Sequence, residues 1–167
     1  VATMRYLAKR VERICDELYR LRIVQRIPLT DLICKKGTYI RPEAADAATP
    51  PWTSFDSRTM HWYGPDEHYW FRTEFTVPKA LNGKAMWLNV RTQIEGDDGK
   101  NPQFLLFVNN VPVQGMDMNH RDVLLSPKAI SGEKLVFDLQ AYTGTIHNEF
   151  NLFMEIQEID PEIEALY

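Results

Sequence analysis

From residue 52 onward, short segments alternate between apolar and polar side chains, and this pattern constrains the fold more than any other feature of the chain. In 69–77, Phe71 and Phe75 fall on one side of an extended strand, while Trp70 and Arg72 fall on the other. Further segments of this kind follow at 84–92, 104–108, 111–113, 134–142 and 150–159. Many short strands without intervening helices are typical of an antiparallel β-sandwich.

The segments 104–108 and 111–113 contain two features that make this prediction more specific. Asn109 and Asn110 separate 104–108 from 111–113, and Asn tolerates the positive φ of a two-residue turn, so we expect a hairpin there. Pro112 lacks the N–H that a central strand needs. The second strand of the hairpin is therefore expected at a sheet edge.

The N-terminal segment follows a different period. Apolar residues spaced by three and four positions predict an amphipathic helix over 4–26, ended by Pro28, so that residues 1–27 form a helical element before a sandwich at 28–159. The apolar stripe consists of Leu7, Val11, Ile14, Leu18 and Leu21. We expect it to dock on its own domain or a neighbouring one, and a homo-oligomer formed by pairing of this helix is the alternative.

Two further segments complete the chain. Residues 41–52 are rich in Pro and Ala and are interpreted as a surface loop. In 160–167, Asp160 and Pro161 are typical of an N-cap and a first helical turn, so we expect a helix that starts here and continues past Tyr167.

Composition and charge exclude several classes of protein. The 167 residues are 44% hydrophobic, enough for a sizeable core, but they contain no run of about 18 apolar residues, so we expect no membrane span. Residues 1–41 carry ten Lys or Arg against four acids, whereas 42–167 carry nine against nineteen; this acidic excess argues against binding to nucleic acid. Cys15 and Cys34 are interpreted as reduced thiols of a cytoplasmic protein.

One stretch resembles a known family. The segment WFRTEFTVP at 70–78, the strand around Trp87 and the motif QGMDMNHRDVLL at 114–125 together resemble the N-terminal domain of glycoside hydrolase family 38 α-mannosidases of the cytosolic or bacterial type. The matching motif positions are Gln114, Gly115, Asp117, Asn119, His120, Val123, Leu124 and Leu125. The resemblance implies a galactose-binding-like jelly-roll β-sandwich whose C-terminal tail leads into a separate catalytic domain. It also implies a zinc ion in that domain and no cofactor in these residues.

The loop at 115–125 is the first candidate site. Asp117, Asn119 and His120 cluster after the hairpin, and we expect them either to fasten this loop or to face a catalytic domain. His120 and Asp122 have the spacing of a metal-ligand pair, but no third His or Cys lies nearby, so we expect no metal here.

Two other segments attract attention. In 61–70, Trp62 and Trp70 are candidates for stacking on sugar rings, and the alternative is that they fill the end of the sandwich. In 94–102, Glu95, Asp97 and Asp98 could offer oxygen ligands to calcium, but their spacing matches no EF-hand loop, so an acidic turn in solvent is preferred.

These observations predict a non-catalytic accessory domain of a zinc-dependent α-mannosidase. We expect these residues alone to hydrolyse nothing, and their partner to be their own downstream catalytic domain. A carbohydrate-binding module for α-mannosides or other glycans, using the aromatics of 61–70, is one alternative. A domain that dimerises through its N-terminal helix is the other.

Overall fold

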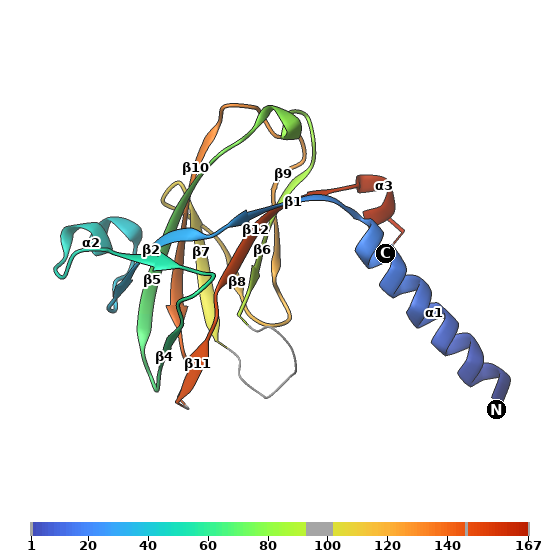
Figure 1. The fold of residues 1–167 in the computed structure, drawn as a ribbon, viewed down its shortest axis with the longest axis horizontal. Coiled ribbons are helices and arrows are strands. Elements are labelled where there is room, and N and C mark those ends of the chain that lie inside the picture. The colour runs from blue at the N-terminus through green and yellow to red at the C-terminus, as the bar shows by residue number, and fades with distance from the viewer. Residues whose placement is uncertain (1, 93–101, 146, 167) are drawn as a thin grey trace.

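The computed structural model describes residues 2–92, 102–145 and 147–166, which form two antiparallel sheets packed face to face (Figure 1). The four-stranded sheet has the order β1-β12-β6-β9, formed by Ile23–Leu29, Phe153–Ile159, Met86–Arg91 and Asp122–Ser126. The six-stranded sheet has the order β3-β2-β5-β10-β7-β8, formed by Thr53–Asp56, Asp31–Lys36, His68–Thr76, Lys134–Tyr142, Gln103–Val108 and Val111–Met116. A small third sheet pairs β11 (Asn148–Phe150) with β4 (Trp62–Gly64), and a 3-10 turn, η1, spans Lys79–Leu81. The predicted mainly β sandwich with an N-terminal helix is confirmed.

The core lies between the two large sheets and follows from the alternation in the sequence. Phe71 of β5 and Phe137 of β10 face inward from one sheet, and Leu88 and Ile156 face them from the other, all fully buried. Because successive residues of a strand point to opposite faces, each strand supplies a row of such residues.

The hairpin at Asn109 and Asn110 forms as predicted. The two residues have φ of 48° and 68°, in the left-handed region that Asn tolerates. Strand β8, which contains Pro112, lies at the edge of the six-stranded sheet, as the missing N–H requires.

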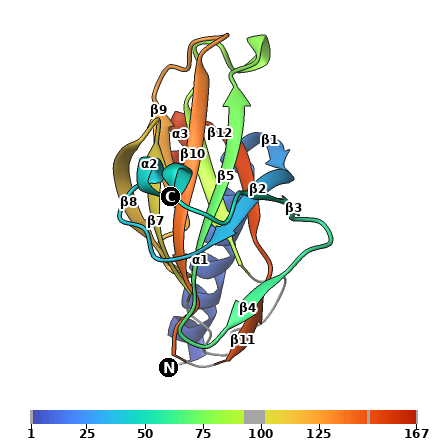
Figure 2. The same ribbon diagram turned by 90° about the vertical axis from the view of Figure 1, so that its left-hand side faces the viewer.

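The segment interpreted as a loop contains a short helix, α2 (Pro42–Ala47), so that interpretation is wrong. Pro42 stands at its first turn, where a missing N–H costs nothing, and alanines of high helix propensity follow. Ala45 is fully buried against Trp70 and Phe107 on the outer face of the six-stranded sheet. Figure 2 looks onto this face, with α2 in front of it.

The N-terminal helix, α1 (Ala2–Leu21), ends earlier than the sequence predicted, and the boundary at residue 27 is wrong. Residues from Ile23 onward instead form β1 and pair with β12, Ile27 opposite Ile156. Strand formation wins here because β-branched side chains suit a pleated strand and because β1 is an edge strand, where Pro28 is tolerated. The sandwich therefore begins about five residues earlier than expected.

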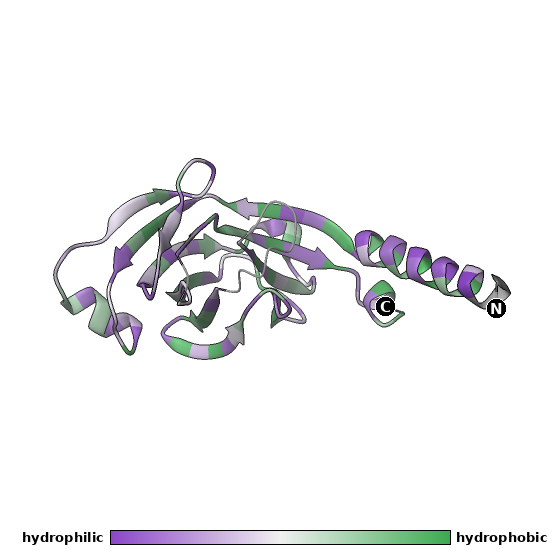
Figure 3. Ribbon diagram, turned by 90° about the horizontal axis from the view of Figure 1, so that it is seen from below, coloured by the Kyte–Doolittle hydropathy of each residue, from purple (hydrophilic) through white to green (hydrophobic). Residues whose placement is uncertain are grey.

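Helix α1 does not dock on the sandwich. It leaves the sheets at its C-terminal end and extends away from them (Figures 1 and 3). Leu7, Val11 and Ile14 are 62%, 52% and 52% exposed, so the expected docking on its own domain is not found among the described residues. No helix in the described part of the chain has the length and apolar character needed to cross a lipid bilayer.

The C-terminal helix α3 (Pro161–Glu164) starts as predicted. The Asp160 side chain accepts hydrogen bonds from the backbone N–H groups of Glu162 at 2.9 Å and Ile163 at 3.3 Å. This cap satisfies N–H groups that have no partner within the helix. The helix lies beside the C-terminal end of α1, on the outer side of the four-stranded sheet (Figure 1).

Candidate functional site

The loop after β8 is held by the side chain of Asp117. Its Oδ1 accepts the backbone N–H groups of Asn119 at 2.8 Å and His120 at 2.9 Å, and lies 3.0 Å from Nδ1 of His120. The bond from the Asn119 N–H, together with both contacts of His120, holds the pKa of Asp117 below its usual value. The three clustered residues thus fasten their own turn, while the His120 side chain remains 70% exposed.

His120 and Asp122 bind different partners and do not form a metal-ligand pair. Asp122 accepts a hydrogen bond from Nδ2 of Asn89 at 2.7 Å and one from Nη2 of Arg22 at 3.3 Å, whereas His120 contacts Asp117. Within the described residues no three His, Cys, Asp or Glu side chains gather in a metal-binding arrangement.

Trp62 and Trp70 are buried, so the hypothesis that they stack on sugar rings is wrong. Trp62 is 1% exposed, packs 4.9 Å from the ring of Phe150, and donates from Nε1 to the carbonyl of Asn151. Trp70 is 0% exposed and lies 5.6 Å from Phe107 under α2. Alternation had placed Trp70 on the outward side of its strand, but the unforeseen helix covers that side. The acidic residues Glu95, Asp97 and Asp98 lie outside the described residues.

A buried arginine joins the C-terminal end of α1 and the helix α3 to the four-stranded sheet. Arg22, between α1 and β1, is 3% exposed and donates to Asp122 of β9 at 3.3 Å and to Glu164 of α3 at 2.8 Å. Its guanidinium also lies 4.2 Å from the ring centre of Tyr19. A buried charge requires paired, hydrogen-bonded partners, and this set fixes where α1 and α3 leave the sandwich.

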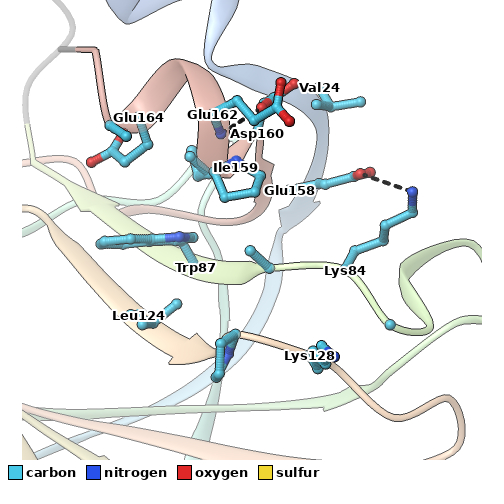
Figure 4. A pocket seen from close by; sticks show the side chains of 15 residues that line it. Val24, Lys84, Trp87, Leu124, Lys128, Glu158, Ile159, Asp160, Glu162 and Glu164 are labelled. Atoms are coloured by element: carbon cyan, nitrogen blue, oxygen red, sulfur yellow. Dashed lines mark hydrogen bonds and ion pairs between the residues drawn. The ribbon is translucent and has the colours of Figure 1, made fainter.

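Beside this junction the outer face of the four-stranded sheet forms an open hollow of about 780 Å³ (Figure 4). Trp87 of β6 is half-buried at its centre, and Leu124 of β9 below it is 46% exposed. Val24 of β1, opposite, is 57% exposed. The other lining residues are Gly83, Lys84, Ala85, Pro127, Lys128, Glu158, Ile159, Asp160, Pro161, Glu162, Glu164 and Ala165.

Most carboxylates of the hollow already have a structural partner. Glu158 accepts a hydrogen bond from Gln25 at 2.7 Å and lies 3.9 Å from Nζ of Lys84. Glu164 binds Arg22, and Asp160 caps α3. The apolar side chains of Trp87 and Leu124 form the floor of the hollow, and charged residues form its rim. This distribution is found at protein interfaces.

The opposite outer face carries a closed polar cluster beneath α2. Arg72 donates from Nε to Asp138 and from Nη1 to Asp46, both at 2.7 Å, and its guanidinium lies 4.7 Å from the centre of the Trp52 ring. Lys35 donates to the carbonyls of Ala45 in α2 and of Ala48 just after its C-terminal end. Burial raises the pKa of Asp138 above its usual value, against the opposing effect of Arg72. These bonds fasten α2 to the sheet.

The sequence did not identify Trp87, Leu124 or Arg22 as candidate site residues. A signal for Trp87 was present, since alternation in 84–92 sets Met86 and Leu88 inward and therefore Trp87 outward. A large ring on an outward position is informative when the described residues cover it only in part. Arg22 could not be recognised, because its partners Asp122 and Glu164 are distant in sequence.

Comparisons with known proteins show the fold. No protein-family model and no curated protein matches the sequence. A solved β-glucuronidase structure from Faecalibacterium prausnitzii is similar over 82% of this chain and 32% of its own, with a TM-score of 0.50 and 9% identity. A β-glucuronidase from Ruminococcus gnavus, in complex with D-glucaro-δ-lactam, is similar over 80% of this chain and 29% of its own, with a TM-score of 0.49 and 11% identity. The chain thus spans about a third of the length of these structures.

Proposed function

We propose that this chain is a non-catalytic accessory module of a glycoside hydrolase, and that it supports a catalytic domain elsewhere in the same protein. The similarity in fold to about a third of a β-glucuronidase chain supports this, because in that structure the similar region is only one part of a larger enzyme chain. The glucuronidase chemistry is not carried over, because 9% identity does not preserve a site.

The observation that carries the proposal is the open hollow around Trp87 and Leu124. It combines a half-buried ring and exposed aliphatic side chains with a charged rim, next to the Arg22 junction that fixes the C-terminal end of α1 and α3 to the sheet. An apolar surface with a charged rim is typical of a contact with another protein domain. The proposed docking surface is therefore the outer face of β6 and β9 together with α3.

A non-catalytic role agrees with the state of the carboxylates. Retaining hydrolysis of a glycoside needs two carboxyl groups about 5 Å apart on either side of one bond. In the hollow, Glu158, Asp160 and Glu164 each hold a structural partner. These bonds assign the three carboxylates to the packing of the edge strand and of α3.

Within this class we propose an α-mannosidase, on the sequence motif at 114–125. The resemblance places the zinc ion of such an enzyme in its catalytic domain, and the described residues of this chain offer no three-ligand group for it. In this proposal Asp117, Asn119 and His120 keep the loop after β8 in shape at the edge of the docking surface.

Hydrolysis assays test the non-catalytic role. The isolated chain, with and without added zinc, should release no nitrophenol from nitrophenyl α-mannoside or β-glucuronide. Turnover by the isolated chain would contradict the proposal. The complete translation product of the gene should hydrolyse one of the two, and α-mannoside is the one expected.

The docking surface is tested by two matched substitutions. Leu124→Asp places a charge on the proposed surface, and Val113→Asp places one at an equally exposed apolar position, 48% against 46%, on the edge strand of the other sheet. In the complete protein, Leu124→Asp should shorten the half-life of activity on heating, and Val113→Asp should not. Equal effects of both would refute docking at this face.

The hollow also supports a second candidate, a carbohydrate-binding role that rests on Trp87 instead of Trp62 and Trp70. A half-buried indole with charged groups around it is a suitable surface for a sugar ring. Calorimetry of the isolated chain with methyl α-mannoside or glucuronic acid tests it. Heat of binding that disappears in Trp87→Ala would favour this role over docking.

A further inference from the structure

Helix α1 presents an apolar stripe that the described part of the chain leaves uncovered. Leu7, Val11 and Ile14 are each more than half exposed, and the helix extends away from the sandwich into open space (Figure 3). Three- and four-residue spacings continue through Leu18, which gives the a and d positions of a coiled-coil heptad. In this register Val11 and Leu18 occupy a, while Leu7 and Ile14 occupy d.

This stripe is complementary to itself when two helices run in opposite directions. In an antiparallel pair each a residue faces a d residue of the other helix. Placing Val11 against Ile14 of a second copy also places Leu7 against Leu18 of that copy. By symmetry four complete apolar layers form between two identical helices.

The charges beside the stripe fit the same register. Arg10 and Glu17 both occupy the g position, and together with Ile14 they line one shallow hollow on the helix, so they lie on one flank. In an antiparallel pair g faces g, and the register set by the apolar layers brings Arg10 opposite Glu17 of the second copy, twice by symmetry. Glu17 also lies 3.4 Å from Nε of Arg13 in its own helix, an exposed pair that leaves Glu17 accessible to Arg10 of the second copy. The other flank brings Ala8 opposite Cys15, both small enough for close approach.

A parallel pair of the same helices fits less well. There g faces e, which brings Arg10 opposite Cys15 and Glu17 opposite Arg22. Arg22 is buried and already bound to Asp122 and Glu164. A parallel pair would also bring two sandwiches to the same end of the helices, whereas an antiparallel pair separates them.

We propose that α1 is a dimerisation helix that pairs antiparallel with α1 of a second copy, with Arg10 opposite Glu17 across the contact. The proposal stands on this helix alone and is independent of the chemistry of the parent enzyme. It assigns the exposed stripe to a symmetric interface that links two modules at a distance.

Charge reversal with mixing tests the register on the 167-residue chain. Arg10→Glu leaves two acids on this flank and Glu17→Arg leaves two bases, so each variant alone places like charges opposite each other. Each should weaken self-association roughly tenfold or more, because two favourable pairs become repulsive. An equimolar mixture should regain wild-type association as heterodimers, measured by sedimentation velocity or light scattering across a range of concentrations.

Two charge reversals on the opposite side of the helix serve as controls. Lys9→Glu and Asp16→Arg change the net charge by the same amounts at exposed f positions, and should leave association unchanged. Circular dichroism checks that each variant keeps its helix content. A wild-type chain that stays monomeric at every concentration would overturn the proposal, and so would single variants that the mixture does not rescue.

Discussion

The outer faces of the two sheets differ in how completely other parts of the chain cover their apolar side chains. On the six-stranded sheet, α2 covers Trp70 and Phe107 completely, and Arg72 binds acids both of the sheet and of the helix. On the four-stranded sheet, Trp87 stays half-buried and Leu124 nearly half exposed. The layers appear in this order in Figure 1, with α2 at the left and α3 and α1 at the right.

The comparison indicates that the outer face of the six-stranded sheet is covered by the chain itself, and that the outer face of the four-stranded sheet can contact another domain. A strand with an apolar ring on its outward face needs a cover, and the chain supplies one for Trp70 from its own α2. Among the described residues only the short α3 lies beside Trp87, next to the C-terminal end of α1. An exposed apolar area with a polar rim is typical of an interaction surface.

The largest expected effect compares one tryptophan from each face. Trp70→Ala should lower the free energy of unfolding by about 3–5 kcal/mol, because it removes a fully buried ring and leaves a cavity. Trp87→Ala should cost no more than about half of that, because its ring is already partly in water. Urea unfolding of the isolated chain measures both, and equal losses would remove the distinction between the faces.

The second prediction concerns the junction on the open face. Arg22→Met should lower the free energy of unfolding by about 2 kcal/mol, since Asp122 and Glu164 lose a buried partner. Arg20→Met, on the exposed side of α1, should change it by less than about 0.5 kcal/mol. A loss of the same size in both variants would mean that the junction contributes nothing specific.

The outer face of the six-stranded sheet, which α2 covers, should make two opposite contributions to the pH dependence of stability. The folded-state pKa of Asp138 is raised by burial, so its ionised form costs stability at neutral pH, and this cost is relieved as pH falls through the raised value. Although burial opposes it, bonds from Arg72 and Trp52 hold the pKa of Asp46 below its usual value, so Asp46 contributes stability that is lost as pH falls.

Asp138→Asn and Asp46→Asn separate these contributions. On acidification the wild type should gain stability relative to Asp138→Asn and lose stability relative to Asp46→Asn. Unfolding free energies of the three proteins from neutral pH to below the ordinary Asp pKa of 3.8 measure both differences. Differences of the same sign would contradict the assigned protonation states.

The smallest effect is expected at the loop beside the open face. Asp117→Ala removes the acceptor for the N–H groups of Asn119 and His120, yet all three residues belong to one solvent-exposed turn. Global stability should barely change. In NMR spectra the amide shifts of Asn119 and His120 should titrate with Asp117 in the wild type and lose that acid titration in the variant.

Local patterns predicted the parts of the fold that neighbouring residues determine. The strands, the turn at Asn109, the edge position of Pro112 and the cap at Asp160 each depend on a few adjacent residues. The end of α1 could not be predicted in the same way, because the first residue that excludes a helix is Pro28, and Ile23–Leu29 form a strand only through pairing with β12. Tertiary pairing overrides local propensity at such a boundary.

The candidate site was predicted less well, for a related reason. Exposure of an aromatic residue depends on what the remainder of the chain places over it, and the cover of Trp70 comes from residues 42–47. The polar loop at 117–120 was found from its clustered side chains, and one of the two roles expected for it, fastening its own turn, matches the bonds of Asp117. The junction at Arg22 joins residues about 100 and 142 positions apart, beyond any local pattern.

Amide hydrogen exchange, compared between this chain alone and the complete translation product of its gene, tests the docking surface most directly. The account predicts added protection in β9 and α3 of the complete protein, and unchanged exchange in α2 and the strands beneath it. Exchange in β9 and α3 that is the same in both proteins, or new protection confined to α2, would contradict it.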